Sequence, residues 1–69
     1  MLTDLEAALV TILKALDLTQ QEVIGIMLML KETPKDQEEL LKFLRNNNPK
    51  ELTARRIIDK VLEITDRGD

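Results

Sequence analysis

Residues 18–30 read LTQQEVIGIMLML, and this stretch decides the fold. Thr19 and Glu22 have the spacing of a capping box, in which each side chain accepts a hydrogen bond from the other residue's main-chain N–H at a helix start. A helix is therefore expected over about 20–31. Because its side chains are apolar nearly all round, we expect it to be buried on most sides and to lie centrally in the fold.

The same capping pattern opens an earlier helix. Thr3 and Glu6 repeat the box, and apolar residues then recur at intervals of three and four up to Leu16. This spacing predicts a helix over about 4–16. The two helices together would form a first hairpin over about 3–31.

Two prolines mark helix starts in the second half of the chain. Thr33 and Pro34 predict a third helix, with Thr33 as the N-cap and Pro34 at the first helical position, where its missing N–H costs nothing. Three asparagines at 46–48 end it, since Asn tolerates the left-handed conformation common after helices. The last helix either begins at Pro49 or follows a single turn and is capped by Thr53.

The expected fold is all-α: a single helical domain over residues 1–69, with four short helices packed as two helical hairpins in a small bundle. The second hairpin covers about 33–66. Apolar residues divide unequally, with 19 of the 30 in residues 1–30. The helix over about 20–31 is therefore expected to carry more apolar surface than the other three helices can cover, which leaves a surplus on the first hairpin.

Composition excludes most kinds of chemistry. The 69 residues include no Cys and no His, which removes disulfides, thiol nucleophiles, imidazole bases and the usual zinc ligands. The acidic residues do not have the spacing of a calcium loop. We therefore expect no catalytic residue, no cofactor, no metal and no small-molecule substrate, and we do not expect an enzyme.

Self-association is the expected function of the surplus apolar surface. Chains this short have little core to spare and commonly add a disulfide, a metal or a partner chain. The sequence therefore predicts a protein-interaction module or small regulator, either a homodimer or a chain that docks on a larger protein. The contact is expected on the first hairpin, through Leu9, Ile12, Leu13, Gly25, Ile26, Met27 and Met29.

Three of these residues allow two interpretations. Gly25, in the middle of a helix, costs about 1 kcal/mol relative to Ala. Close approach of another helix would offset that cost, either across a dimer axis or within one chain. Met27 and Met29 are flexible thioethers that either fill the core or form an adaptable binding surface.

Basic residues of the last helix support an alternative, a small nucleic-acid-binding regulator. Arg55, Arg56 and Lys60 would contact phosphates. Acidic residues alternate with these bases, and the formal net charge of the chain is −3. Since nucleic-acid binding favours a basic face, nucleic acid is the less favoured partner.

No stretch approaches the roughly 20 apolar residues that span a bilayer. The longest apolar run, residues 23–30, has eight residues including Gly25. The first residues carry acids and no basic segment, so no signal peptide is expected. These features predict a cytoplasmic protein without membrane contact. The chain has the general look of small bacterial helical proteins, but no motif in it identifies a family.

Overall fold

The computed structural model describes residues 3–66, so the first two and last three residues of the expected domain lie outside it. This part of the chain folds into four α-helices and one 3-10 turn. The all-α fold predicted from the sequence is confirmed. The elements are α1 (Asp4–Ala15), α2 (Gln20–Met29), α3 (Pro34–Asn46), the 3-10 turn η1 (Pro49–Glu51) and α4 (Ala54–Asp66).

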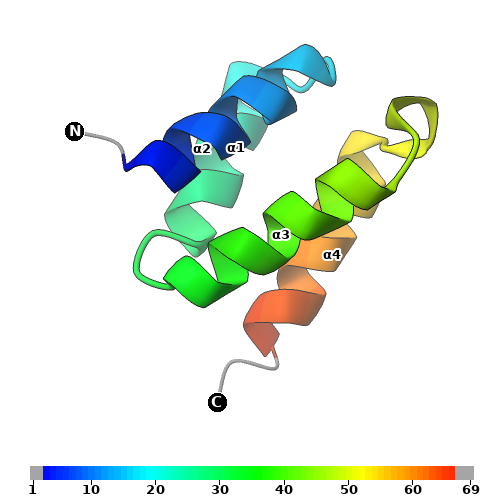
Figure 1. Ribbon diagram of the computed structural model, residues 1–69. Helices are drawn as coiled ribbons and strands as arrows, with labels where there is room; N and C mark the ends of the chain where they lie inside the picture. The colour runs from blue at the N-terminus through cyan, green and yellow to red at the C-terminus, as the bar shows by residue number, and fades with distance from the viewer. Residues whose placement is uncertain (1–2, 67–69) are drawn as a thin grey trace.

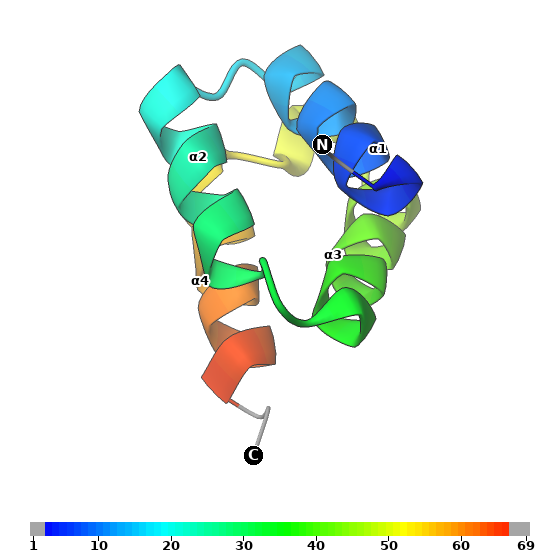
Figure 2. The same ribbon diagram turned by 90° about the vertical axis from the view of Figure 1, so that its left-hand side faces the viewer.

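The helices form two layers. Figure 1 shows α1 and α3 in front and α2 and α4 behind them, and Figure 2 shows the same layers from the side. Within the layers α1 packs against α3 and α2 packs against α4, while α1–α2 and α3–α4 are the two hairpins that join the layers. Each helix therefore has two principal neighbours.

Because of this arrangement, α2 does not lie more centrally than the other helices. Val23 and Ile26 turn inward and are buried against the rest of the bundle. Ile24, Leu28 and Met29 remain exposed. A helix with two principal neighbours keeps an outer face, and on α2 that face is apolar.

The core is aliphatic, and every helix contributes to it. Its side chains recur at intervals of three, four or seven along each helix, as expected for one inward stripe. Within residues 3–66 the buried apolar side chains are Leu9, Leu13, Val23, Ile26, Leu30, Leu40, Leu44, Leu52, Ile57, Val61 and Ile64.

Both predicted capping boxes are present. The main-chain N–H of Glu6 donates to Thr3 Oγ1 (3.1 Å), and the N–H of Thr3 donates to Glu6 Oε1 (3.0 Å). At α2 the N–H of Glu22 donates to Thr19 Oγ1 (3.2 Å), and the N–H of Thr19 donates to Glu22 Oε1 (2.9 Å). These hydrogen bonds satisfy helix N–H groups that have no partner within the helix.

The start of α4 follows the second of the two alternatives. Residues Pro49–Glu51 form a separate 3-10 turn, in which Asn48 Oδ1 accepts a hydrogen bond from Lys50 N (3.0 Å). Thr53 then precedes α4, and its Oγ1 accepts from Arg56 N (3.3 Å).

Thr33 is the N-cap residue of α3, as predicted, but the side-chain cap expected from it is wrong. Thr33 precedes the helix and Pro34 is in its first turn, but the Thr33 side chain makes no cap hydrogen bond. Its hydroxyl instead donates to the carbonyl oxygen of Leu30 (3.3 Å). The hydroxyl therefore completes the end of α2 and leaves the first turn of α3 uncapped by a side chain.

The left-handed ending predicted for α3 is also wrong. Asn47 is extended (φ −118°, ψ 150°), and its Nδ2 donates to the carbonyl oxygen of Phe43 (2.7 Å). Within residues 3–66, the one residue other than glycine with positive φ is Asp17, at φ 67°, just after α1. The helix α3 therefore ends where the sequence predicts, but it ends with a side-chain hydrogen bond from an extended Asn47 and not with a left-handed residue.

Candidate interaction surface

The outer face of α2 carries the most prominent exposed apolar side chains of the first hairpin. Leu28 is 65% exposed, Ile24 49% and Met29 41%. These side chains lie within about two turns of one helix. We call this surface, together with Gly25 between them, the α2 patch. Contiguous exposed apolar side chains on a small protein commonly mark a contact with another molecule.

Gly25 lies at the centre of the α2 patch and is exposed. A Cβ atom built on it would have no heavy atom within 4 Å beyond its own chain neighbours and the adjacent backbone of α2. No helix of the same chain therefore approaches Gly25, and close packing within one chain does not explain its place in α2.

A groove between α1 and α2 adjoins the α2 patch. Its lining is mainly apolar and is rimmed by charged and amide side chains of both helices. The lining residues are Glu6, Val10, Lys14, Gln20, Val23, Ile24, Met27, Leu28 and Lys31.

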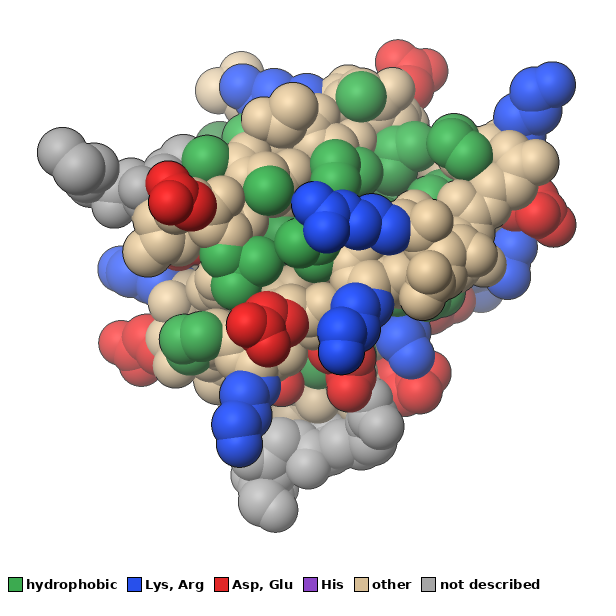
Figure 3. Space-filling model, viewed as in Figure 1, with side chains coloured by type: hydrophobic (Ala, Val, Ile, Leu, Met, Phe, Trp, Pro, Cys, Tyr) green, Lys and Arg blue, Asp and Glu red, His purple; other side chains and the backbone are tan. Residues whose placement is uncertain are grey.

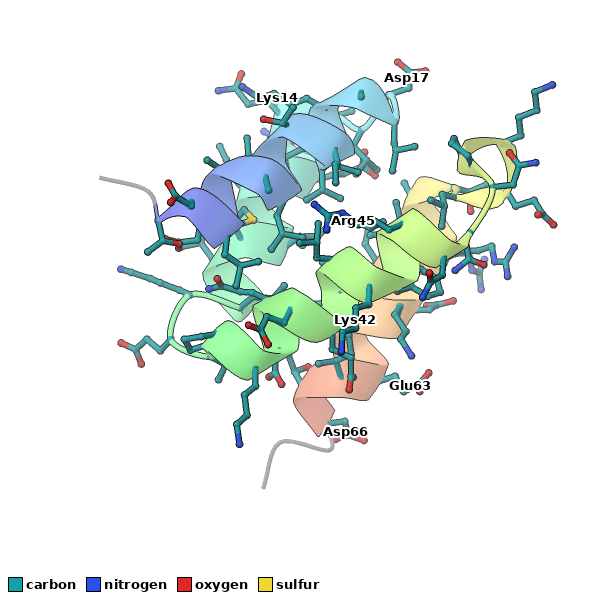
Figure 4. All side chains as sticks on the ribbon, in the orientation of Figure 1. Lys14, Asp17, Lys42, Arg45, Glu63 and Asp66 are labelled. Carbon is teal, nitrogen blue, oxygen red and sulfur yellow. The ribbon has the colours of Figure 1, made fainter. Side chains whose placement is uncertain are left out.

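The two ends of this groove carry charges. Figure 4 shows Lys14 near the C-terminal end of α1. At the other end of α1, the hydrogen bonds from Thr3 hold the pKa of the Glu6 carboxyl below its ordinary value of 4.5, and Lys31 lowers this pKa further. The rim therefore includes both signs of charge.

Three residues expected at the contact lie in the core of the single chain. Leu9 and Leu13 are 0% exposed and Ile26 is 2% exposed. They form the inward stripes of α1 and α2, so a partner cannot reach them while the chain keeps this fold.

The other expected contact residues are more accessible. Met29 and Gly25 are exposed in the α2 patch, and Met27 is half-buried and lines the groove. Ile12 is half-buried against the core. The sequence prediction omitted Leu28. Helical spacing alone could not have found it, because residues 23–30 are apolar nearly all round; position 28 turns outward because the bundle turns positions 23, 26 and 30 inward.

Of the three basic residues of the nucleic-acid alternative, Arg56 and Lys60 line one hollow on α4, whereas Arg55 does not. Arg55 and Arg56 are neighbours in sequence, so their side chains leave α4 about 100° apart. Arg56 Nη1 donates to the carbonyl oxygen of Glu51 (3.2 Å). This hydrogen bond holds the Arg56 guanidinium against its own chain.

Lys60 is likewise engaged within the chain. Its Nζ lies 3.5 Å from Glu63 Oε1 and 5.5 Å from the centroid of the Phe43 ring. Asp59 and Glu63 line the same hollow as Arg56 and Lys60. Acids therefore surround the two bases, an arrangement that disfavours phosphate.

The face formed by α1 and α3 also has mixed charge. Figure 3 shows acidic and basic side chains interspersed on it, with apolar side chains between them. Figure 4 shows Lys42 and Arg45 of α3 on this face, with the Arg45 side chain directed toward α1. No region of one sign is visible from this side.

Within residues 3–66, no group of three or more His, Cys, Asp or Glu side chains is placed to hold a metal ion. In the same part of the chain, each helix is too short or too polar to cross a bilayer.

No protein-family model, curated protein or solved structure shows significant similarity to this chain. Function is therefore inferred from the surface of the chain itself.

Proposed function

We propose that this chain is a non-enzymatic protein-interaction module that self-associates through the α2 patch on its first hairpin. The observation that carries the proposal is the exposure of Leu28, at 65%, between two other exposed apolar side chains on the same helix. Burying such side chains contributes about 25 cal/mol per Å² of apolar area removed from water.

The surroundings of the α2 patch fit a protein partner. Protein interfaces commonly have an apolar centre and a polar rim. Here the apolar side chains adjoin a groove rimmed by Glu6, Lys14, Gln20 and Lys31. A helix that lies on an anionic membrane would instead have a predominantly basic flank.

The size of the α2 patch indicates a weak association. A stable interface buries about 800 Å² on each partner, which is more than a few turns of one helix provide. We therefore expect a dissociation constant on the order of 10 to 100 μM, so the oligomeric state would depend on concentration.

Light scattering from about 5 to about 500 μM tests the proposal. The molar mass of the wild-type chain is expected to rise from 7.9 kDa toward twice that value. Leu28→Lys is expected to remain at the monomer mass. Leu62→Lys is the matched control, because Leu62 is also an exposed leucine, at 50%, but lies on α4 outside the α2 patch.

Circular dichroism would establish that both variants keep the helical content of the wild type. A wild-type chain that stays monomeric up to about 500 μM would contradict self-association. A dimer that Leu28→Lys leaves unchanged would place the contact elsewhere and contradict the proposed surface.

A further inference from the structure

We propose that two copies of this chain associate through antiparallel α2 helices related by a two-fold axis, with Leu28 of each copy seated over Gly25 of the other. This inference rests on the proposed self-association and specifies its geometry. It follows from a notch and a projection that lie on the same helix face, three residues apart.

The notch is Gly25. It lies in the interior of α2, with open space where a Cβ would be. Glycine in such a position is unfavourable relative to alanine, and the single chain offers no close contact that offsets it. A side chain from a second molecule can approach the main chain of α2 more closely here than at its neighbours.

The projection is Leu28, the most exposed of the large apolar side chains in residues 3–66. Residues three apart on a helix share one face and lie one turn from each other. Val23 and Ile26 face the core, so Gly25 and Leu28 belong to the opposite side of α2. Figure 2 shows that α2 lies at the edge of the bundle, where this side is open.

A two-fold axis makes this face complementary to itself. In such a contact, when residue i of the first copy meets residue j of the second, residue j of the first copy also meets residue i of the second. An antiparallel pairing that places Leu28 over Gly25 therefore fills both notches at once. The same register brings Gln21 of one copy to the level of the turn that follows α2 in the other copy, where Glu32 is also exposed and polar.

A parallel pairing would not pack as well. It would bring Leu28 against Leu28 at one level and Gly25 against Gly25 at another, which leaves a gap beside a crowded contact. Protein contacts are close-packed, so the antiparallel register is favoured. A second copy supplies the matching projection and notch without any other partner.

Gly25→Ala tests the notch. The added methyl group favours the helix, so at low concentration the equilibrium constant for folding of the monomer is expected to rise about five-fold. The same methyl group fills the notch, so the dissociation constant of the dimer is expected to rise about ten-fold. Thr11→Ala is the control, since it raises helix propensity at an exposed site on α1 and should leave the dissociation constant unchanged.

Single cysteines test the direction of the helices, because the chain contains no other cysteine. Gln21→Cys mixed with Glu32→Cys is expected to give a disulfide between the two variants under mild oxidation. Gln21→Cys alone is expected to give little, since two copies of position 21 would be separated by roughly 16 Å along the antiparallel helices. Mass spectrometry distinguishes the products.

The outcomes separate the two proposals. A dimer that forms disulfides chiefly between two copies of position 21, or whose dissociation constant is unchanged by Gly25→Ala, would overturn the antiparallel contact but leave self-association in place. A wild-type chain that is monomeric throughout would overturn both. Opposite effects of Gly25→Ala on folding and association, together with the mixed disulfide, would support the contact.

Discussion

The side-chain amide of Gln37 donates a 2.7 Å hydrogen bond to the main-chain carbonyl oxygen of Leu30. Gln37 lies near the start of α3 and is 3% exposed, while Leu30 caps the C-terminal end of α2 and is 0% exposed. The last carbonyl groups of a helix lack partners within the helix. This hydrogen bond therefore fixes the end of the first hairpin to the beginning of the second.

Gln37→Glu is expected to destabilise the fold at neutral pH. The substitution keeps the side-chain shape but replaces the amide donor with a carboxylate, which faces a carbonyl oxygen in a buried site. We expect the free energy of unfolding at pH 7 to fall by about 2 kcal/mol. As the pH falls the acid gains a proton that it can donate to Leu30, so part of the stability should return. Urea unfolding at pH 7 and near pH 4 measures both effects.

Gln20→Glu is the matched control for this substitution. Gln20 is exposed in the first turn of α2, where a negative charge is mildly favourable. The control should therefore keep the stability of the wild type at pH 7. Equal stability of the two variants at that pH would show that the hydrogen bond of Gln37 contributes little.

The two threonines before α2 and α3 are expected to differ in their contribution to stability. Thr19 Oγ1 accepts the N–H of Glu22, whereas Thr33 makes no cap hydrogen bond. Thr19→Ala should lower the free energy of unfolding by about 1 kcal/mol, and Thr33→Ala by less than half as much. Chemical denaturation of both variants tests the difference. A larger loss for Thr33→Ala would mean that its hydroxyl bond to Leu30 outweighs a helix cap.

Asp17 offers a stabilising substitution. It has φ 67° after the C-cap Leu16 of α1, a conformation that costs most residues free energy and suits glycine. Its carboxylate also lies at the negative end of the helix dipole. Asp17→Gly should therefore raise the free energy of unfolding by about 1 kcal/mol, and the melting temperature by about 4–8 °C.

Asp17→Ala separates these two causes. It removes the charge but keeps a Cβ in the left-handed conformation, so it should gain less than Asp17→Gly. Thermal unfolding of the three chains gives the order. An alanine variant as stable as the glycine variant would assign the gain to charge alone.

Helix positions could be predicted because their signals are local. Thr3 with Glu6 and Thr19 with Glu22 start helices through hydrogen bonds between residues three apart, and the structure contains all four of these bonds. Thr33 and Pro34 also mark the start of α3 correctly, but the Thr33 hydroxyl contacts Leu30, at the end of the preceding helix, and does not cap α3. Cap motifs indicate where a helix begins, but tertiary contacts decide which side chain serves the cap.

The candidate surface could be predicted only in part. The surplus of apolar residues identifies the first hairpin, but the outward direction depends on which helices flank α2. That arrangement is set by packing between residues distant in sequence, such as the contact of α2 with α4. Leu9 and Leu28 are both leucines on the first hairpin, yet one is 0% and the other 65% exposed. Composition does not distinguish them.

Glu6 is expected to make stability depend on pH in the acidic range. The hydrogen bonds from Thr3 lower the pKa of its carboxyl in the folded chain below the ordinary value of 4.5. The charged form is therefore favoured by folding. Its contribution to stability is present above about pH 4.5 and is lost as the pH falls through the lowered pKa of the folded state.

Glu6→Gln lacks this titration, so the stability difference between wild type and variant should be constant from pH 7 to pH 5 and should shrink below pH 4.5. Urea unfolding of both chains across this range measures the difference, in which the shared titrating groups cancel. A difference that grows on acidification would mean that the folded chain favours the protonated form of Glu6.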